Sequence, residues 1–246
     1  MSEIWLVTGA AGGLGRAVVA KGRSAGAKIA VTGRDSERLK DAFGDEHLQI
    51  EADVSTSEGA KLAVATCVER LGTPTRLAHC VGSILIAPAA RTTEQQYRDV
   101  LRSNLDSAFF TLSNVVAAAR SAGQGASLCF VSTIAAQIGI ANHEAVAAAK
   151  GGLDAMVRSA AATYAPQGIR VNAVAPGLMD TPAAAKFLST PALREASAKQ
   201  YPLGSIGSAE EIADLMSWLL SDAASRVTGQ IWALDGGFTA VRPLVR

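Results

Sequence analysis

The stretch Ile4-Trp5-Leu6-Val7-Thr8-Gly9-Ala10-Ala11-Gly12-Gly13-Leu14-Gly15 joins a short apolar run directly to a glycine-rich turn. The run predicts a buried β-strand, and the turn opens a helix predicted over residues 13–25. Gly9 permits a tight turn, Gly13 lets the backbone approach a ligand, and Gly15 allows close packing of the helix. Because a helix N-terminus attracts anions, this turn, with Gly12 and Leu14, predicts a binding site for the pyrophosphate of a dinucleotide.

The rest of the chain alternates short apolar runs with alanine-rich helical stretches. The apolar runs lie at residues 4–7, 29–31, 48–50, 77–81, 128–131, 171–174 and 231–234. Helices are predicted over residues 13–25, 57–71, 93–120, 143–164 and 209–220. This alternation is typical of βαβ units. It predicts an α/β protein with a doubly wound parallel sheet, or Rossmann fold, of about seven strands with helices on both faces.

The domain organisation follows from the even composition of the chain. No linker rich in Pro, Gly or Ser divides the 246 residues, which favours one domain over residues 1–246. Residues 178–206 differ because they carry Pro182, Pro191 and Pro202, so we expect short helices in a long mobile insertion. Ligands of open α/β sheets bind beyond the carboxyl ends of the strands, where such an insertion would form a substrate lid. A solvated loop without function is the alternative.

Charge and composition restrict the kind of partner. The 23 basic and 22 acidic residues leave a net charge of +1, which offers no bulk attraction for nucleic acid or an anionic membrane. The first residues lack the basic and long apolar regions of a signal peptide, and no later run is long enough to span a bilayer. We therefore expect a cytoplasmic protein that acts on a small-molecule substrate.

The three cysteines, Cys67, Cys80 and Cys129, are widely spaced in apolar surroundings. This pattern favours buried free thiols in a reducing compartment over a disulfide or a set of metal ligands. No metal is expected, and a catalytic cysteine is the remote alternative.

The end of the second predicted strand indicates which dinucleotide binds. A protein that prefers NAD normally places a carboxylate there, on the ribose 2′-hydroxyl. Here Gly33 leaves that place empty, and Arg34 offers a guanidinium for a 2′-phosphate. NADP(H) is therefore preferred. NAD(H) stays open because Gly12 is not the second basic residue often found beside a 2′-phosphate, and Arg34 could be an ordinary solvated arginine.

With these motifs in this order, the chain resembles the short-chain dehydrogenase/reductase family over nearly its whole length. The resemblance implies that Asp53, with Val54, contacts the adenine, that Asn104 belongs to the active-site network, and that Lys150 is the active-site lysine. It also implies a set of residues around the nicotinamide and the cofactor turn: Gly82, Pro176, Gly177 and Thr181. The run Asp235-Gly236-Gly237 matches the closing strand.

Several departures from the family pattern bear on catalysis. The family's proton-donating tyrosine lies four residues before the lysine, where this chain has Val146, and an aliphatic side chain transfers no proton. Thirteen residues before that position the family usually has a serine, and here Thr133 keeps the hydroxyl that polarises a substrate oxygen. The usual Asn-Asn-Ala-Gly is replaced by His79-Cys80-Val81-Gly82. For His79 we expect a satisfied, partly buried histidine rather than a residue at the cofactor.

His143 is the candidate to replace the tyrosine. It lies seven positions before Lys150, which puts the two about 20° apart around a helix axis and so on one face. Enoyl-reducing branches of the family have their tyrosine at this spacing, and imidazole can donate a proton near neutrality. The helix dipole opposes a charged imidazole at an N-terminus, so a histidine that caps the helix or lines the pocket is the alternative. Glu144 and Tyr97 are weaker candidates.

Two functions remain at the level of sequence. The retained Thr133, Asn104 and Lys150 favour an NADP(H)-dependent oxidoreductase that reduces a carbonyl or a conjugated double bond, with the proton from His143 or ordered water. Val146 favours a catalytically impaired NADP(H)-binding sensor or scaffold. The family resemblance further implies a homotetramer, or failing that a homodimer, formed through the helices at 93–120 and 143–164 and the closing strand.

Overall fold

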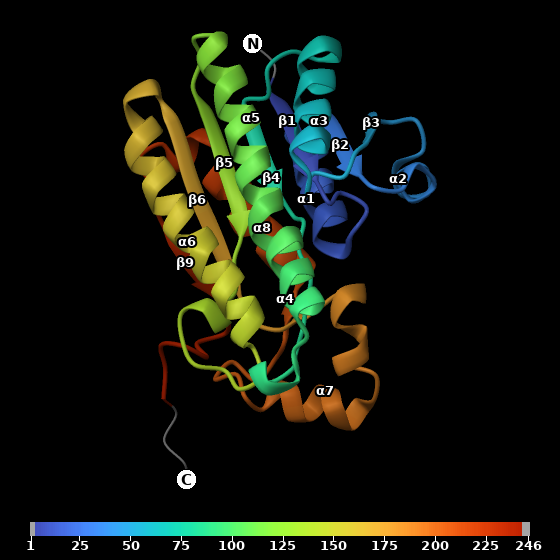
Figure 1. Ribbon diagram of the computed structural model, residues 1–246, viewed down its shortest axis with the longest axis vertical. Helices are drawn as coiled ribbons and strands as arrows, with labels where there is room; N and C mark the ends of the chain where they lie inside the picture. The colour runs from blue at the N-terminus through green and yellow to red at the C-terminus, as the bar shows by residue number, and fades with distance from the viewer. Residues whose placement is uncertain (1–2, 243–246) are drawn as a thin grey trace.

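The computed structural model describes residues 3–242, in which seven parallel strands form one sheet (Figure 1). The strands are β1 (Ile4–Thr8), β2 (Lys28–Gly33), β3 (Leu48–Glu51), β4 (Arg76–His79), β5 (Ala126–Val131), β6 (Ile169–Pro176) and β9 (Ile231–Leu234). They lie in the order β3-β2-β1-β4-β5-β6-β9, and each neighbouring pair is parallel. The prediction of a doubly wound parallel sheet is confirmed.

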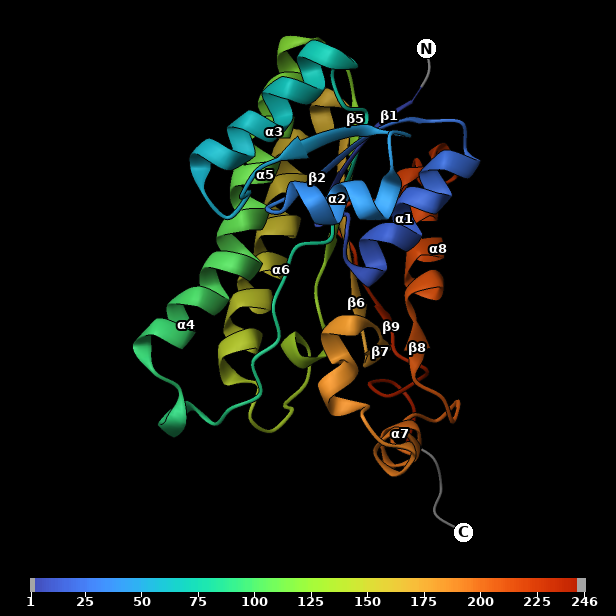
Figure 2. The ribbon, with the colours of Figure 1, turned by 90° about the vertical axis from the view of Figure 1, so that its right-hand side faces the viewer.

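Helices cover both faces of this sheet (Figure 2). One face carries α1 (Gly13–Ser24), α2 (Ser36–Phe43) and α8 (Ala209–Leu220). The other carries α3 (Ser57–Arg70), α5 (Ser107–Ser121) and α6 (Glu144–Tyr164), with α4 (Glu94–Leu101) packed against α6. The strands are therefore buried on both sides, which is why they read as nearly continuous apolar runs in the sequence.

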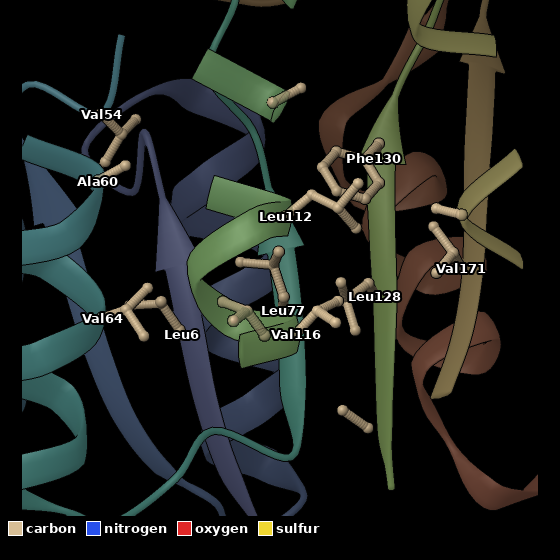
Figure 3. Packing of buried hydrophobic residues seen from close by; sticks show 14 of the residues in the cluster. Leu6, Val54, Ala60, Val64, Leu77, Leu112, Val116, Leu128, Phe130 and Val171 are labelled. Atoms are coloured by element: carbon tan, nitrogen blue, oxygen red, sulfur yellow. The ribbon is translucent and has the colours of Figure 1, made fainter. Parts of the chain in front are cut away.

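The core on the α3–α5–α6 face is built from small aliphatic side chains. Leu6, Leu77 and Leu128, on three adjacent strands, pack with Val64 of α3 and Val116 of α5 (Figure 3). Successive side chains of a strand point to opposite faces, so Trp5 and its alternate neighbours fill the core beneath α1 and α8 instead. The two cores fix the sheet between the helices and hold the strand ends in place.

The helix predicted over residues 93–120 is interrupted. A π-helical turn over Arg102–Asp106 separates α4 from α5. Within it, the amide of Asn104 donates a hydrogen bond to the carbonyl of Val100 at 3.0 Å, and the hydroxyls of two neighbouring serines also bond to helix carbonyls. Side chains that compete in this way for backbone carbonyls loosen the regular helical ladder. The π-turn places Asn104 in the interior, where it is fully buried.

Helix α2 and a pair of short strands have no counterpart among the predicted elements. Helix α2 follows β2 and begins at the N-cap Asp35, whose carboxylate accepts from the N–H of Arg38 at 3.0 Å. In the segment 178–206, a 3-10 helix (Pro182–Phe187) and α7 (Pro191–Ala198) are the expected short helices. Short strands β7 (Met179–Asp180) and β8 (Gly207–Ser208) pair at the base of this segment and bring its ends together. Its action as a lid stays a prediction.

The strand order reverses between β1 and β4, and this point locates the candidate site. In open α/β sheets ligands bind in the crevice outside the carboxyl ends of strands at such a reversal. The glycine turn follows β1, and the segments after β4, β5 and β6 converge on the same edge of the sheet. The glycine turn, Asn104, Lys150 and the segment after β6 therefore meet at one end of the molecule.

Candidate active site

The turn after β1 has the geometry that its glycines predict. Gly9 has φ +66°, and a Cβ there would lie 3.0 Å from the backbone of Cys80. A Cβ on Gly15 would overlap the carbonyl oxygens of Gly9 and Ala10. No side chain caps α1, and its first turn contains no acidic residue. The N–H groups of that turn can therefore bind the pyrophosphate of a dinucleotide, so the residues present fit the expected cofactor.

The end of β2 is open to a charged ligand. Gly33 is half-buried, and a Cβ there would make only an ordinary 3.4 Å contact with Leu39. The next residue, Arg34, is exposed and makes no hydrogen bond or ion pair with any residue in the range 3–242. A guanidinium with unused donors at this edge is suited to bind a phosphate.

Asp53 follows β3, at the same edge of the sheet as Arg34, and its side chain is ionised. Burial by itself raises the pKa of Asp53, but hydrogen bonds from the Ser55 hydroxyl and N–H, at 2.7 and 3.0 Å, and the charges of Arg34 and Arg102 bring it below its ordinary value. Both bonds go to Oδ1, which leaves Oδ2 to accept from an amino group such as that of adenine. Val54 beside it is buried.

Lys150, Asn104 and Gly82 meet beyond the ends of β4 and β5. The ammonium of Lys150 donates to the carbonyl of Val131 at 2.6 Å. A Cβ on Gly82 would lie 2.9 Å from Oδ1 of Asn104 and 3.4 Å from Nζ of Lys150, so only glycine fits there comfortably. Burial lowers the pKa of Lys150 to about 8, and Asp154 acts in the opposite direction. The lysine is therefore mostly protonated near neutral pH.

Asn104 is fixed by its own hydrogen bonds. Its Oδ1 accepts from the N–H of Ser83 at 3.2 Å, and its Nδ2 donates to the Ser83 carbonyl at 3.2 Å and to the Val100 carbonyl at 3.0 Å. These bonds hold the segment after β4 against the π-turn. Asn104 thus shapes the wall next to Lys150.

Thr133 lies two residues after the end of β5, as the N-cap of a short 3-10 helix (Ile134–Ala136). The side chain is half-buried, and its Oγ1 accepts from the N–H of Ala135 at 3.3 Å. A hydroxyl has one donor and two acceptor sites. Its own hydrogen is not used in a hydrogen bond with another residue in the range 3–242.

Val146 lies in the first turn of α6, four residues before Lys150, whereas His143 precedes the helix as its N-cap residue. Val146 is buried among aliphatic side chains that include Leu85. His143 stands at the N-cap, half-buried, with Nδ1 2.8 Å from the carbonyl of Ala141. Because a carbonyl only accepts, Nδ1 carries the hydrogen, and Nε2 is left for other partners. The hydrogen bonds found in the described residues do not connect His143 to Lys150 or Thr133.

The segment after β6 contacts the glycine turn. A Cβ on Gly13 would lie 3.0 Å from Pro182 and 3.3 Å from Thr181. Pro176 ends β6, and Gly177 lies so close to the ring of Tyr201 that a Cβ there would be 2.8 Å from it. The glycine turn, expected at the pyrophosphate, and the segment after β6, expected at the nicotinamide, are therefore in contact.

Comparison with known proteins decides the family. A family profile described as "Enoyl-(Acyl carrier protein) reductase" matches residues 9–239. The chain is 36% identical over 246 residues to cis-4-hydroxycyclohexanecarboxylate dehydrogenase of Sinomonas cyclohexanicum, with 97% of each chain covered. It is 31% identical to cyclohexanol dehydrogenase of Acinetobacter sp. (strain SE19), covering 97% of this chain and 96% of that protein.

Solved structures agree with the sequence relatives. The short-chain type dehydrogenase/reductase from Mycobacterium ulcerans superimposes with a TM-score of 0.90 at 28% identity, covering 97% of this chain and 91% of the other. The chain belongs to the short-chain dehydrogenase/reductase family. It is an NAD(P)-dependent oxidoreductase of that family, which confirms the first of the two functions at this level of detail.

In this short-chain dehydrogenase/reductase, His79 is a structural residue. It is buried, more completely than predicted, with Nδ1 2.9 Å from the Thr8 hydroxyl and Nε2 3.1 Å from that of Ser107. Burial, together with the charge of Lys150, lowers the pKa of His79 to about 3, so the ring is neutral. The expectation of a satisfied histidine is confirmed, and His79 ties β4 to β1 and α5.

The cysteines are free thiols, as expected, with Cys67 and Cys129 buried and Cys80 half-buried. Burial raises the pKa of Cys67 and of Cys80 to about 12, so both stay protonated and unreactive at neutral pH. In the part of the chain that the structure describes, no cluster of three or more potential ligands could hold a metal. Within the same range, no helix combines the length and apolar character needed to cross a membrane.

Tyr201 is a residue at this site that sequence reasoning missed. Its ring is buried against Phe238 with centroids 5.2 Å apart, and its hydroxyl accepts from the N–H of Leu178 at 2.6 Å. Burial raises the pKa of Tyr201, so the phenol is neutral. Its signal in the sequence is faint: an aromatic residue just before Pro202 in a segment rich in Ala and polar residues.

Proposed function

We propose that the chain is an NADP(H)-dependent oxidoreductase that reduces a carbonyl group or a conjugated double bond with an atypical proton donor. The observation that carries the proposal is the meeting of Lys150, Asn104 and Gly82 at the strand ends, next to a glycine turn without a side-chain cap. Perturbed titratable groups at such a crevice are typical of catalytic sites.

The residues that would hold the dinucleotide are assigned by their places around the crevice. The N–H groups of the glycine turn would bind the pyrophosphate, and Asp53 and Val54 would contact the adenine. Arg34 would bind the 2′-phosphate, and Lys150 would bind the nicotinamide ribose. The nicotinamide is held by the segment after β6 through Pro176, Gly177 and Thr181. When bound, the dinucleotide supplies the hydride.

The protein's own groups would manage the substrate oxygen and the proton. The free hydroxyl hydrogen of Thr133 bonds to the substrate oxygen and orients the reacting carbon. The nearby ammonium of Lys150 stabilises the negative charge that develops on that oxygen. Val146 supplies no proton, so we assign donation to the doubly protonated ring of His143, which keeps its Nδ1–H on the carbonyl of Ala141 and gives the proton of Nε2 to the substrate.

The substrate is a small molecule, and its class is proposed from the relatives. Two of them are named as dehydrogenases of cyclohexane-ring alcohols, so cyclic ketones head the list of candidates. Conjugated enoyl compounds come next because of the description of the matching family profile. Residues 178–206, which begin against the glycine turn, would close over such a substrate as a lid.

A binding protein without chemistry is the second candidate, and the aliphatic Val146 is the observation that favours it. Loss of NADPH absorbance, measured with a panel of cyclic ketones, aldehydes, quinones and enoyl thioesters, separates the two. We expect turnover with at least one class. If calorimetry shows NADPH bound and no compound is reduced, the protein is a sensor or scaffold.

Cofactor choice gives a direct prediction. Replacing Arg34 by Ala should weaken NADP(H) binding by about 1 to 3 kcal/mol, the range for a charged hydrogen bond, with little effect on NAD(H). Gly33→Asp should reverse the preference, because a carboxylate there repels a 2′-phosphate and accepts from a 2′-hydroxyl, and the added Cβ meets only Leu39. Calorimetric titration of both cofactors measures this, with the exposed Arg23→Ala as control. Equal losses for the two cofactors in Arg34→Ala would remove the phosphate role.

We also propose that the chain assembles as a homotetramer, or failing that a homodimer. Large apolar side chains, Tyr97 and Phe109, are exposed on α4 and α5, which are expected to take part. Next to the closing strand β9, the exposed Trp218 of α8 stacks on Trp232 with ring centroids 5.3 Å apart. Such side chains are favoured in interfaces. Light scattering at micromolar concentration should give the mass of four or two chains. A monomer at that concentration would rule the assembly out.

A further inference from the structure

Asp154 is a buried carboxylate that the mechanism above does not use. It lies four residues after Lys150 on α6, and its relative exposure is only 5%. Its Oδ1 has no hydrogen-bond partner within residues 3–242, and the buried Oγ of Ser132, at the end of β5, has none either. An unpaired carboxylate in an interior is costly, so a compensating charge or solvent contact is expected nearby.

The neighbouring cation is Lys150, one helical turn away on the same face. It is as deeply buried as Asp154, with an exposure of 5%. The groups around it on other elements carry no charge: the carbonyl of Val131 on β5, Asn104 in the π-turn, and the neutral His79 and Cys80 at the end of β4. Asp154 is the carboxylate that acts on this lysine.

A cavity of about 590 Å³ opens beside Asp154. Its wall includes Asp154, Gln137 after β5, Arg158 on α6, and Gly229 and Gln230 before β9. Gln137, Arg158 and Gln230 are exposed, so solvent can enter between them. The carboxyl group therefore borders a cavity that is open to water.

The titration of the two groups agrees with this arrangement. Burial raises the pKa of the Asp154 carboxyl, and the charges of Arg158 and Lys150 offset part of that rise. For Lys150, burial lowers the pKa to about 8 and Asp154 opposes the lowering. Besides each other, the charged group that acts on Lys150 and Asp154 is Arg158, on the same helix. Within residues 3–242, no charged residue of β4, β5 or the π-turn acts on either of them.

We propose that Asp154 is the counter-ion of the active-site Lys150, keeps it in the ammonium form, and exchanges its own proton with solvent through the cavity beside Gln137 and Gln230. The catalytic consequence rests on the proposed function, whereas the charge coupling does not. Asp154 is a positioning residue: it acts on the reacting oxygen through the charge of Lys150.

The coupling is tested on the protein without cofactor by recording the ¹³Cε resonance of Lys150 against pH. The resonance is assigned by its loss in Lys150→Met. Asp154→Asn removes the negative charge and keeps the shape, so the midpoint should fall by about one pH unit, the Coulomb effect expected for buried charges one turn apart. Asp214→Asn, the same change at an exposed site on the opposite face of the sheet, should leave the midpoint unchanged.

A second readout uses the pH dependence of turnover. If the ammonium form is the active one, NADPH-dependent turnover declines as pH rises through the pKa of Lys150. A midpoint one unit lower in Asp154→Asn reduces turnover at pH 8 by roughly five-fold and leaves it nearly unchanged at pH 6. A merely structural role would lower turnover at both pH values and leave the midpoint in place.

The outcomes are distinct. Should no substrate be reduced, the proposed function fails and the resonance titration still decides the coupling. A Lys150 midpoint that Asp154→Asn does not move overturns the proposal, whatever the kinetics. If that variant does not fold, the wild-type Lys150 resonance must show a second, smaller step at acidic pH as Asp154 takes up its proton, and a single step overturns the proposal.

Discussion

Replacing Gly15 by Ala should lower the affinity for NADP(H) by at least about 100-fold, equivalent to about 2.7 kcal/mol. A Cβ at this position overlaps the carbonyl oxygens of Gly9 and Ala10, so the turn or the start of α1 must shift. Backbone cannot yield as cheaply as the end of a side chain. The shift misplaces the N–H groups that would bind the pyrophosphate, and calorimetric titration measures the loss.

The matched control is Gly139→Ala, because a Cβ at Gly139 meets nothing within 4 Å and the backbone there is not in the left-handed region. It should bind NADP(H) like the parent chain. If Gly15→Ala folds, as circular dichroism would show, and binds the cofactor normally, the glycine turn is not the pyrophosphate site.

Replacing His143 by Ala should lower turnover by about 100-fold or more, the lower end of what general acid catalysis contributes. The affinity for NADP(H) should hardly change, since the ring is assigned to the substrate and not to the cofactor. Rapid-mixing measurement of NADPH oxidation gives the rate, and calorimetry gives the affinity. His47→Ala, which removes a half-buried imidazole packed on Phe43 at the other end of the sheet from α6, should retain full activity.

The converse substitution is Val146→Tyr, which places a phenol one turn from Lys150. Carbonyl reduction should rise, because the neighbouring ammonium favours ionisation of a phenol and so its action as an acid. Should His143→Ala retain full activity while Lys150→Met abolishes it, the proton passes through water and the Lys150 network, and the assignment of His143 is wrong.

The sheet could be predicted because its strands are buried on both faces and joined by long helices. Each strand reads as an apolar run, and the glycine turn after β1 marks the first βαβ unit of the series. Helix α2 escaped prediction because Leu39 is its one buried residue among those described, too little to produce a helical period. The π-turn escaped because Asn104 and its serine neighbours act through hydrogen bonds to carbonyls, which leave no mark on hydrophobic periodicity.

Some residues of the candidate site could likewise be predicted from the sequence, and others could not. Gly9, Gly15 and Gly82 could be found because a close backbone approach demands glycine at fixed positions of a motif. Asp154 could not, because a single carboxylate on a helix reads as a solvated residue until the fold buries it beside Lys150. Tyr201 acts across 23 residues on the N–H of Leu178, a contact that depends on how the segment after β6 folds back.

The most direct test of the proposed chemistry is hydride transfer itself. NADPH carrying two deuterium atoms at C4 of the nicotinamide is incubated with the protein and with cyclic ketones and enoyl compounds, and the products are examined by mass spectrometry. We expect one deuterium in the reduced product for each NADPH consumed, and no transfer with Lys150→Met. Bound NADPH that stays intact with every compound, under conditions where calorimetry shows the site saturated, would contradict the assignment as an active reductase.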